Sequence, residues 1–214
     1  MSRDLFQAIS SGDVAAVHAI LGEAPAQAGA RNEAGVSAIL WAKYNGQDMA
    51  LQALLAARPT LDAFDAAALG DLDRLTALLD EDPARATAFA ADGFTPLHLA
   101  AYFGHRLTVG LLLERGADPR AEARNASRVA PLHSAVASGR CGPVALLLAG
   151  GAEPNPRQQG GYTPLHAAVK RGDFEMVGLL MDHSADPTIR DDDGRSALDH
   201  AGKDPRMLLL LDGV

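Results

Sequence analysis

The stretch that decides the fold is Asp92–His105, which reads DGFTPLHLAAYFGH. Thr95 can cap a helix by accepting a hydrogen bond from a first-turn amide, and Pro96 suits the first helical position because it has no amide hydrogen to leave unpaired. Leu97 and the small residues after it form an apolar stripe, and Gly104 then breaks the helix. The stretch therefore predicts a short helix that ends in a tight turn.

Close copies of this stretch return along the chain. Thr95 is matched by Ala130, Thr163 and Ser196, at spacings of 35, 33 and 33 residues. Upstream, the same small-residue run ending in glycine and a polar residue occurs without the Thr-Pro-Leu-His phrase. Seven units are predicted, starting near residues 3, 37, 61, 95, 130, 163 and 196. A period of this length is typical of repeat proteins.

Each unit is expected to contain a second helix. Residues 105–118 read HRLTVGLLLERGAD and carry apolar residues at helical spacing up to Gly116, which suits a left-handed helix C-terminus. Pro119 cannot continue the helix, so the residues after it are expected to project as an extended finger. One helix pair cannot bury its own apolar face, whereas stacked neighbours can.

The phrases DGFTPLHLAAYFGH…LLLERGAD, APLHSAVASGR…LLLAGGAE and YTPLHAAVKRGD…LLMDHSAD resemble ankyrin repeats. The resemblance is strong over Asp92–Gly194 and weaker over Arg3–Asp82, where the small-residue helix, the glycine turn and a Leu-Leu pair survive. It implies an all-α solenoid of about six to seven stacked helix-turn-helix repeats with β-hairpin-like fingers. We expect residues 1–214 to form a single domain of this kind.

Three departures from the repeat pattern are expected to alter the stack. Residues 54–68, LLAARPTLDAFDAAA, pass almost directly from one helix pair to the next, so the finger between the second and third units is expected to be missing. Ser184 replaces the glycine after the sixth unit's second helix, which predicts a strained or altered cap. The short last unit, residues 196–214, is expected to cap the stack, and its four leucines at 208–211 leave a dimer contact as the alternative to a monomer.

Composition and charge bear on nucleic-acid binding, on membrane spans and on the compartment of the protein. The formal net charge of −8 opposes binding to nucleic acid through the overall field, although a local basic patch would remain compatible with it. The chain starts without a signal-peptide pattern and has no run of about 18 apolar residues. Cys141 is its only cysteine, which fits a reducing compartment. We expect a cytoplasmic protein without a membrane span, and the preference for Arg over Lys is typical of a GC-rich bacterial genome.

The chain's histidines and acidic residues offer candidate chemical sites. His98, His133 and His166 occupy equivalent places in consecutive units, about 10 Å apart, whereas zinc ligands must all lie within about 2 Å of one point. The ankyrin resemblance implies a structural role for them, in which they bind backbone groups and tie adjacent units. The DDDG sequence at 191–194 lacks the glutamate that would close a calcium loop. With no catalytic motif evident, we expect no metal, no cofactor and no enzyme activity.

The ankyrin resemblance also implies where a partner binds, namely at the fingertips and at the residues just before each glycine turn. Much of the scarce aromatic content falls there, which favours anchoring of a partner. Seven cations fall there too, which predicts a basic C-terminal half-groove. The expected partner-binding residues are Tyr44, Phe94, Tyr102, Phe103, Arg124, Arg128, Arg157, Tyr162, Lys170, Arg171, Arg190 and Arg195.

A structural explanation of the same residues stays open. Phe94 and Tyr102 could instead cover neighbouring fingers, and the arginines could pair with Asp191–Asp193 and Glu122. The sequence favours a non-catalytic module that binds another protein, one with an acidic face, through its concave surface. The alternative is a regulatory subunit or inhibitor that covers an enzyme's active site. Nucleic-acid binding through the basic half-groove is the less favoured hypothesis.

Overall fold

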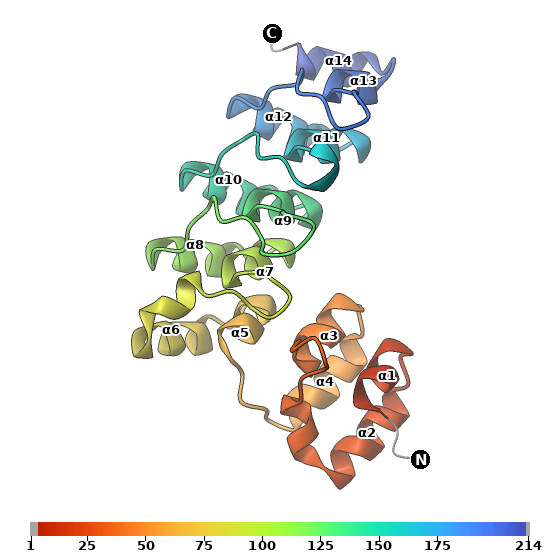
Figure 1. The fold of residues 1–214 in the computed structure, drawn as a ribbon, viewed down its shortest axis with the longest axis vertical. Coiled ribbons are helices and arrows are strands. Elements are labelled where there is room, and N and C mark those ends of the chain that lie inside the picture. The colour runs from red at the N-terminus through yellow and green to blue at the C-terminus, as the bar shows by residue number, and fades with distance from the viewer. Residues whose placement is uncertain (1–3, 213–214) are drawn as a thin grey trace.

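The computed structural model describes residues 4–212, which form a row of stacked helix pairs (Figure 1). Fourteen α-helices lie within the described residues. The first helices of the pairs are α1 (Leu5–Ser10), α3 (Ala38–Tyr44), α5 (Ala63–Leu69), α7 (Pro96–Tyr102), α9 (Pro131–Ser138), α11 (Pro164–Lys170) and α13 (Ala197–Ala201). The second helices are α2 (Val14–Glu23), α4 (Asp48–Ala56), α6 (Leu72–Glu81), α8 (Arg106–Glu114), α10 (Cys141–Ala149), α12 (Phe174–Asp182) and α14 (Pro205–Leu211).

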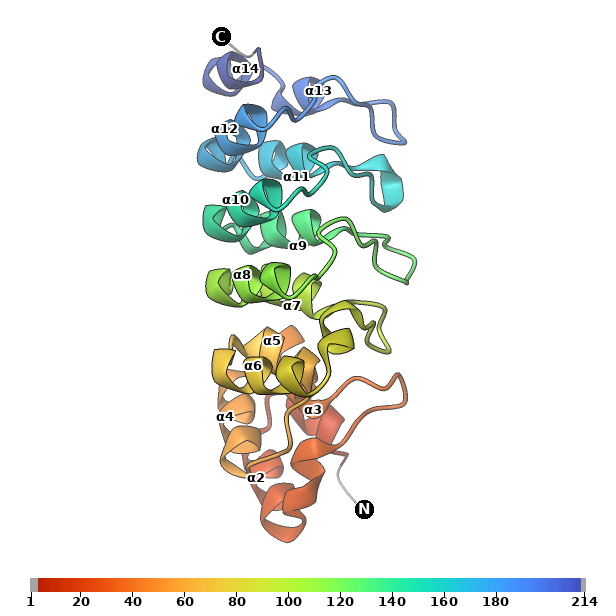
Figure 2. The ribbon, with the colours of Figure 1, turned by 90° about the vertical axis from the view of Figure 1, so that its left-hand side faces the viewer.

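Fingers project from one side of the stack, opposite the second helices (Figure 2). They contain three short 3-10 turns, η1 (Pro25–Gly29), η2 (Pro83–Thr87) and η3 (Gln159–Gly161). Over residues 4–212 the fingers hold no strand, and only two isolated antiparallel bridges occur, Arg31 with Ser37 and Arg190 with Ser196. The all-α repeat stack is therefore confirmed, and its fingers are turns rather than regular hairpins.

Local sequence explains where the helices begin. Thr95 precedes α7 with an extended backbone, and its hydroxyl accepts a hydrogen bond from the amide of His98. Proline stands at the first helical position of α7, α9 and α11, where its missing amide hydrogen costs nothing. The second helices α2, α6 and α12 begin after Asp13, Asp71 and Asp173, whose carboxylates accept from amides of the first turn.

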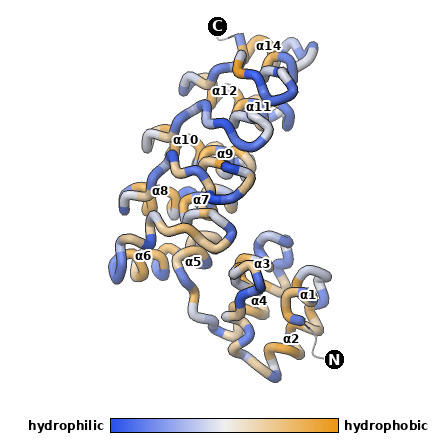
Figure 3. Tube along the Cα trace, in the orientation of Figure 1, coloured by the Kyte–Doolittle hydropathy of each residue, from blue (hydrophilic) through white to orange (hydrophobic). Residues whose placement is uncertain are grey.

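Hydrophobic residues follow the helices, and hydrophilic residues gather in the turns and fingers (Figure 3). The buried residues form two large clusters. One extends from Leu5 to Leu54 through α1–α4, and the other from Ala63 to Leu211 through α5–α14. Within residues 4–212, no helix is long and apolar enough to cross a membrane.

The two clusters are separated where α4 passes to α5. Residues 57–62 join these helices, a link too short to form a finger of the kind found after α2 or α6. In Figure 1 the α1–α4 part is offset from the rest of the stack below α5. A small third cluster, with Val36, Leu40, Ala68 and Leu99 at its centre, lies between the two. We call this boundary, formed by α3 against α5 and α7, the junction.

The helix ends use left-handed residues. Gly116 follows α8 with φ 83°, and Ser184 occupies the corresponding place after α12 with φ 66°. A side chain in this region is strained because its Cβ approaches the following carbonyl. The altered cap expected at Ser184 is therefore present as a strained serine.

Exchanging glycine and serine at these two caps should move stability in opposite directions. Ser184 is exposed, so Ser184→Gly should raise the free energy of unfolding by about 0.5–1 kcal/mol by relieving the left-handed strain. A Cβ at Gly116 would meet no atom within 4 Å, so Gly116→Ser tests backbone strain alone and should lower that free energy by about 1 kcal/mol. Urea unfolding measures both, and a loss of stability in Ser184→Gly would contradict the strain.

Candidate binding surface

A pocket of about 460 Å³ spans the junction. Its aromatic walls come from both sides: Trp41 and Tyr44 from α3, Phe94 from the finger before α7, and Tyr102 from the end of α7. The remaining lining residues are Val36, Asp92, His98, Leu99, Ser127, Val129, His133, Ser134 and Gln158. We call this cavity the junction pocket.

Trp41 is held in place by the first helix of the stack. Its indole Nε1 donates to Ser10 Oγ at 2.8 Å, and its ring meets Phe6 edge-on with centroids 6.3 Å apart. A half-buried indole with a satisfied N–H can still offer its ring to a ligand. Trp41 thus forms a wall of the pocket that is fixed from behind by α1.

Tyr44 reaches across the junction. Its hydroxyl donates to Asp92 Oδ2 at 2.8 Å, and its ring stacks on Phe103 with centroids 6.0 Å apart. Burial and the neighbouring Asp92 carboxylate raise the pKa of Tyr44 well above its usual value, so the phenol stays protonated and keeps donating. Tyr102 meets the same Phe103 ring edge-on and remains 47% exposed.

Two further polar contacts join the two sides of the junction. Ser37 Oγ donates to the buried carboxylate of Asp65, and Arg31 pairs with Asp62. Burial and the nearby Asp62 charge raise the pKa of Asp65 to about 6, although the bond from Ser37 opposes this shift. The ionised Asp65 is therefore a costly group at neutral pH.

The structure brings most of the expected aromatic residues together. Tyr44, Phe94 and Tyr102 line the junction pocket, whereas Phe103 lies behind it, with Lys43 Nζ 4.3 Å from the centre of its ring. Sequence reasoning missed Trp41, the chain's only tryptophan. The signal was present: Trp41 lies three residues before Tyr44 in one helix, and such residues share a helix face.

The expected cations are arranged differently, because all seven have partners within the chain. Four of them form ion pairs: Arg128 with Glu122 at 3.1 Å, Arg157 with Asp192 at 3.4 Å, Arg190 with Asp199 at 3.1 Å, and Arg195 with Asp193 at 2.9 Å. The sequence had suggested three of these carboxylates, Glu122, Asp192 and Asp193, as partners of the arginines. It had not suggested Asp199. Exposed pairs of this kind contribute little stability, but they neutralise much of the local positive charge.

The other three cations bind rings or carbonyls. Arg124 lies 3.8 Å from the centre of the Phe89 ring, and Arg171 donates to the carbonyls of Val136 and Ala137. Lys170 Nζ lies 4.7 Å from the centre of the Tyr162 ring. These contacts place the three charges against the chain's own surface, but their partners are neutral, so the positive charge of these three side chains is retained.

The repeated histidines bind backbone groups on both sides. In His98, His133 and His166, Nδ1 accepts from the amide of the residue that precedes the helix, and Nε2 donates to a carbonyl of the following finger. Burial lowers the pKa of His98 and of His133 to about 4. Both rings that line the pocket are therefore neutral at pH 7.

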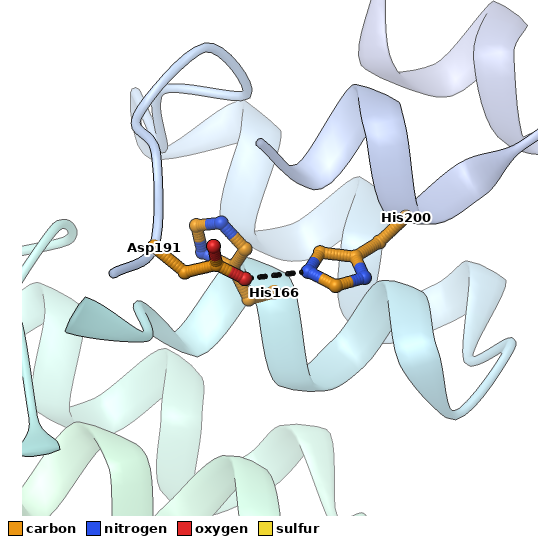
Figure 4. A group of neighbouring side chains, drawn as sticks. All are labelled: His166, Asp191 and His200. Carbon is orange, nitrogen blue, oxygen red and sulfur yellow. Dashed lines mark hydrogen bonds and ion pairs between the residues drawn. The ribbon is translucent and has the colours of Figure 1, made fainter. Parts of the chain in front are cut away.

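His166, Asp191 and His200 form the one described group whose side chains could together hold a metal ion, with ligand atoms within 4.8 Å of one another (Figure 4). Hydrogen bonds already occupy these atoms. His200 Nε2 donates to Asp191 Oδ2 at 2.8 Å, and Asp191 Oδ1 accepts from the amides of Asp193 and Arg195. Although burial alone would raise it, these bonds lower the pKa of Asp191 to about 2. A metal would have to displace this internal network.

The repeat stack and its hydrogen bonds define the class of protein. A family model described as ankyrin repeats matches residues 5–123, 63–158 and 132–211. The chain therefore belongs to the ankyrin-repeat family.

Comparison with individual proteins supports the same fold. The crystal structure of the ankyrin repeat domain of Bcl-3, described as a unique member of the IkappaB protein family, is similar with a TM-score of 0.64 and 27% identity, covering 99% of this chain and 98% of that one. In rice (Oryza sativa subsp. japonica), E3 ubiquitin-protein ligase XB3 is 46% identical over 67 residues, and probable E3 ubiquitin-protein ligase XBOS31 is 48% identical over 60 residues. These segments cover 30% and 27% of this chain but only 14% and 13% of the two ligases.

The buried carboxyl at the junction leads to a prediction about pH. The pKa of Asp65 is raised from 3.8 to about 6 in the folded protein, so folding takes up a proton and this group's contribution to stability is lost as pH rises through 6. Asp65→Asn keeps an oxygen acceptor for Ser37 but has no charge to bury. The unfolding free energy of Asp65→Asn minus that of the wild type should therefore be about 2 kcal/mol larger at pH 7.5 than at pH 4.5, since one pKa unit corresponds to 1.36 kcal/mol.

Urea unfolding at the two pH values measures this difference. Asp182→Asn, which changes an exposed carboxylate at the end of α12, is the control for general charge effects. A difference between Asp65→Asn and the wild type that stays constant with pH would contradict the raised pKa.

Proposed function

We propose that this chain binds a partner protein through its concave surface and that the junction pocket is the centre of the site. Ankyrin-repeat domains are protein-interaction modules and are themselves non-catalytic. The observation that carries the proposal is the gathering of Trp41, Tyr44, Phe94 and Tyr102 around one pocket. Aromatic side chains that stay partly exposed supply most of the energy in many protein interfaces.

The shape of the site supports this assignment. The Tyr102 ring is held against Phe103, and Phe103 in turn stacks on Tyr44, so the pocket walls lose little conformational freedom when a ligand enters. Leu99 and Val36, both nearly fully buried, complete the apolar lining. A partner side chain that enters the pocket would therefore exchange water for contact with mostly apolar walls.

The cations have a smaller part in this proposal. An acidic partner face would have to compete with the ion pairs that Arg128, Arg157, Arg190 and Arg195 already make. The same competition weakens the hypothesis of nucleic-acid binding, which depends on free positive charge. We place Arg124, Lys170, Arg171 and Tyr162 at the edge of the site, where they could adjust its specificity.

We further propose that residues 1–214 act as one monomeric interaction domain in the cytoplasm. Leu209 is 63% exposed on α14, which keeps a contact between copies as the alternative. Inhibition of an enzyme remains a second form of the same binding function. It would be recognised by a fall in the partner's turnover when this protein is added.

Changing one pocket wall tests the proposal. Tyr102→Glu puts a charge at the edge of the aromatic pocket, which should reduce retention of the native partner at least about tenfold, the effect of 1.4 kcal/mol. Leu107→Glu is the matched control, because Leu107 is also exposed but lies on the second helix α8. Affinity capture from a lysate of the source organism, quantified by mass spectrometry, gives the retained proteins.

Circular dichroism should show both variants folded. A partner retained by the wild type and the Leu107→Glu variant but lost by Tyr102→Glu would support the pocket as the site. Equal retention by all three proteins would place the interface elsewhere.

A further inference from the structure

We propose that the junction pocket recognises an extended peptide segment in which a large apolar side chain lies next to a lysine or arginine. The apolar side chain fills the pocket, and its cationic neighbour pairs with Asp92. This inference rests on the proposed function and adds the chemistry of the partner. It follows from the charge of the pocket, its position across two core clusters and the arrangement of its hydrogen bonds.

The pocket lining contains a single acidic side chain and no lysine or arginine. Among its lining residues within 4–212 the acidic residue is Asp92, and burial lowers the pKa of His98 and His133 to about 4. The other walls are apolar side chains, hydroxyls and one amide. A ligand complementary to this lining is apolar over most of its contact and positive at one point.

Asp92 still has capacity to accept hydrogen bonds. Its Oδ2 accepts from the Tyr44 hydroxyl at 2.8 Å, and its Oδ1 accepts from the amide of Phe94 at 3.3 Å. A carboxylate offers about four acceptor positions, so about two remain for a ligand. Asp92 has no ion pair with any residue in the range 4–212, whereas the four ion-paired arginines are matched with other carboxylates.

The net charge of the whole chain also favours a cationic ligand. A chain with a net charge of −8 attracts cationic segments at long range and slows the approach of acidic ones. Four of the C-terminal arginines are paired with carboxylates, which reduces their opposition to this field near the pocket. Charge complementarity therefore favours a basic apolar segment over the acidic face that the sequence alone suggested.

Because the pocket lies between the two large core clusters, a bound side chain should also affect the stability of the stack. Trp41 and Tyr44 belong to the α1–α4 side, while Leu99 and Tyr102 belong to the α5–α14 side. A side chain between these walls contacts both sides and adds to the small third cluster at the junction. A ligand that binds only the folded protein stabilises that state, so the unfolding temperature should rise with the concentration of the ligand.

A library of random linear peptides displayed on phage tests the chemistry, selected in parallel on the wild type, Asp92→Asn and Tyr102→Ala, which removes the ring without adding a charge. Trp41 is the chain's only tryptophan and lines the pocket, so tryptophan fluorescence reports binding of each synthesised peptide. We expect peptides enriched on the wild type to carry Phe or Leu adjacent to Lys or Arg. Their binding should change the Trp41 emission and should be lost with Tyr102→Ala.

A double-mutant cycle then isolates the charge contact. Replacing the peptide's cation with norleucine should weaken binding about tenfold to the wild type but by less than about twofold to Asp92→Asn, which still accepts the Tyr44 bond. Asp182→Asn, far from the pocket in sequence and on α12, should behave as the wild type does.

The outcomes separate the two proposals. Peptides that change Trp41 emission and require Tyr102, but show no coupling to Asp92 or prefer acidic residues, would overturn the basic apolar segment and leave the binding site intact. If every enriched peptide binds equally well to Tyr102→Ala, or none is enriched, both the pocket assignment and this inference are overturned.

Discussion

Every helix pair in this protein depends on a neighbouring pair, because its apolar face is too large for the pair to bury alone. Between α5 and α14 this requirement is met by regular stacking, which produces one continuous cluster of buried residues. Residues 57–62 interrupt the regularity, since they join α4 to α5 without a finger. The core divides there, and the two parts meet through a small cluster around Leu40 and Ala68. The junction pocket is a direct result of this incomplete contact.

Polar groups hold the stack together without charging its inner surface. Burial lowers the pKa of His98 and His133 to about 4. In each repeated histidine, Nδ1 accepts from the amide that precedes its own helix, and Nε2 donates to a carbonyl of the following finger. The six arginines expected at the partner surface lie against carboxylates, a ring or carbonyls of their own chain. Asp92 differs from both groups, because its carboxylate stands beside an apolar pocket with only neutral donors. The surface around the pocket therefore presents one acidic group beside apolar side chains, a combination that composition alone does not reveal.

Much of the fold could be predicted because its determinants are local. Thr95 and Pro96 mark a helix start wherever they stand, and Ser184 in place of glycine marks a strained cap. The site was harder to predict. Tyr44, Phe94 and Tyr102 were found from their repeat positions, but Trp41 was missed because its repeat position does not by itself mark it as exposed. The partner of each arginine depends on fingers that are brought together only in the stack, as Arg157 and Asp192 illustrate.

The sequence by itself determined the repeat unit, the order of the units and the place where a finger is absent. These features follow from helix caps, turn residues and apolar spacing, which act over a few residues at a time. Only the tertiary structure decided that the gap becomes a pocket, that Tyr44 reaches Asp92 across it and that four of the expected arginines form internal ion pairs. Each of these depends on distances between residues of different repeats, and the curvature and offset of the packed helices set those distances.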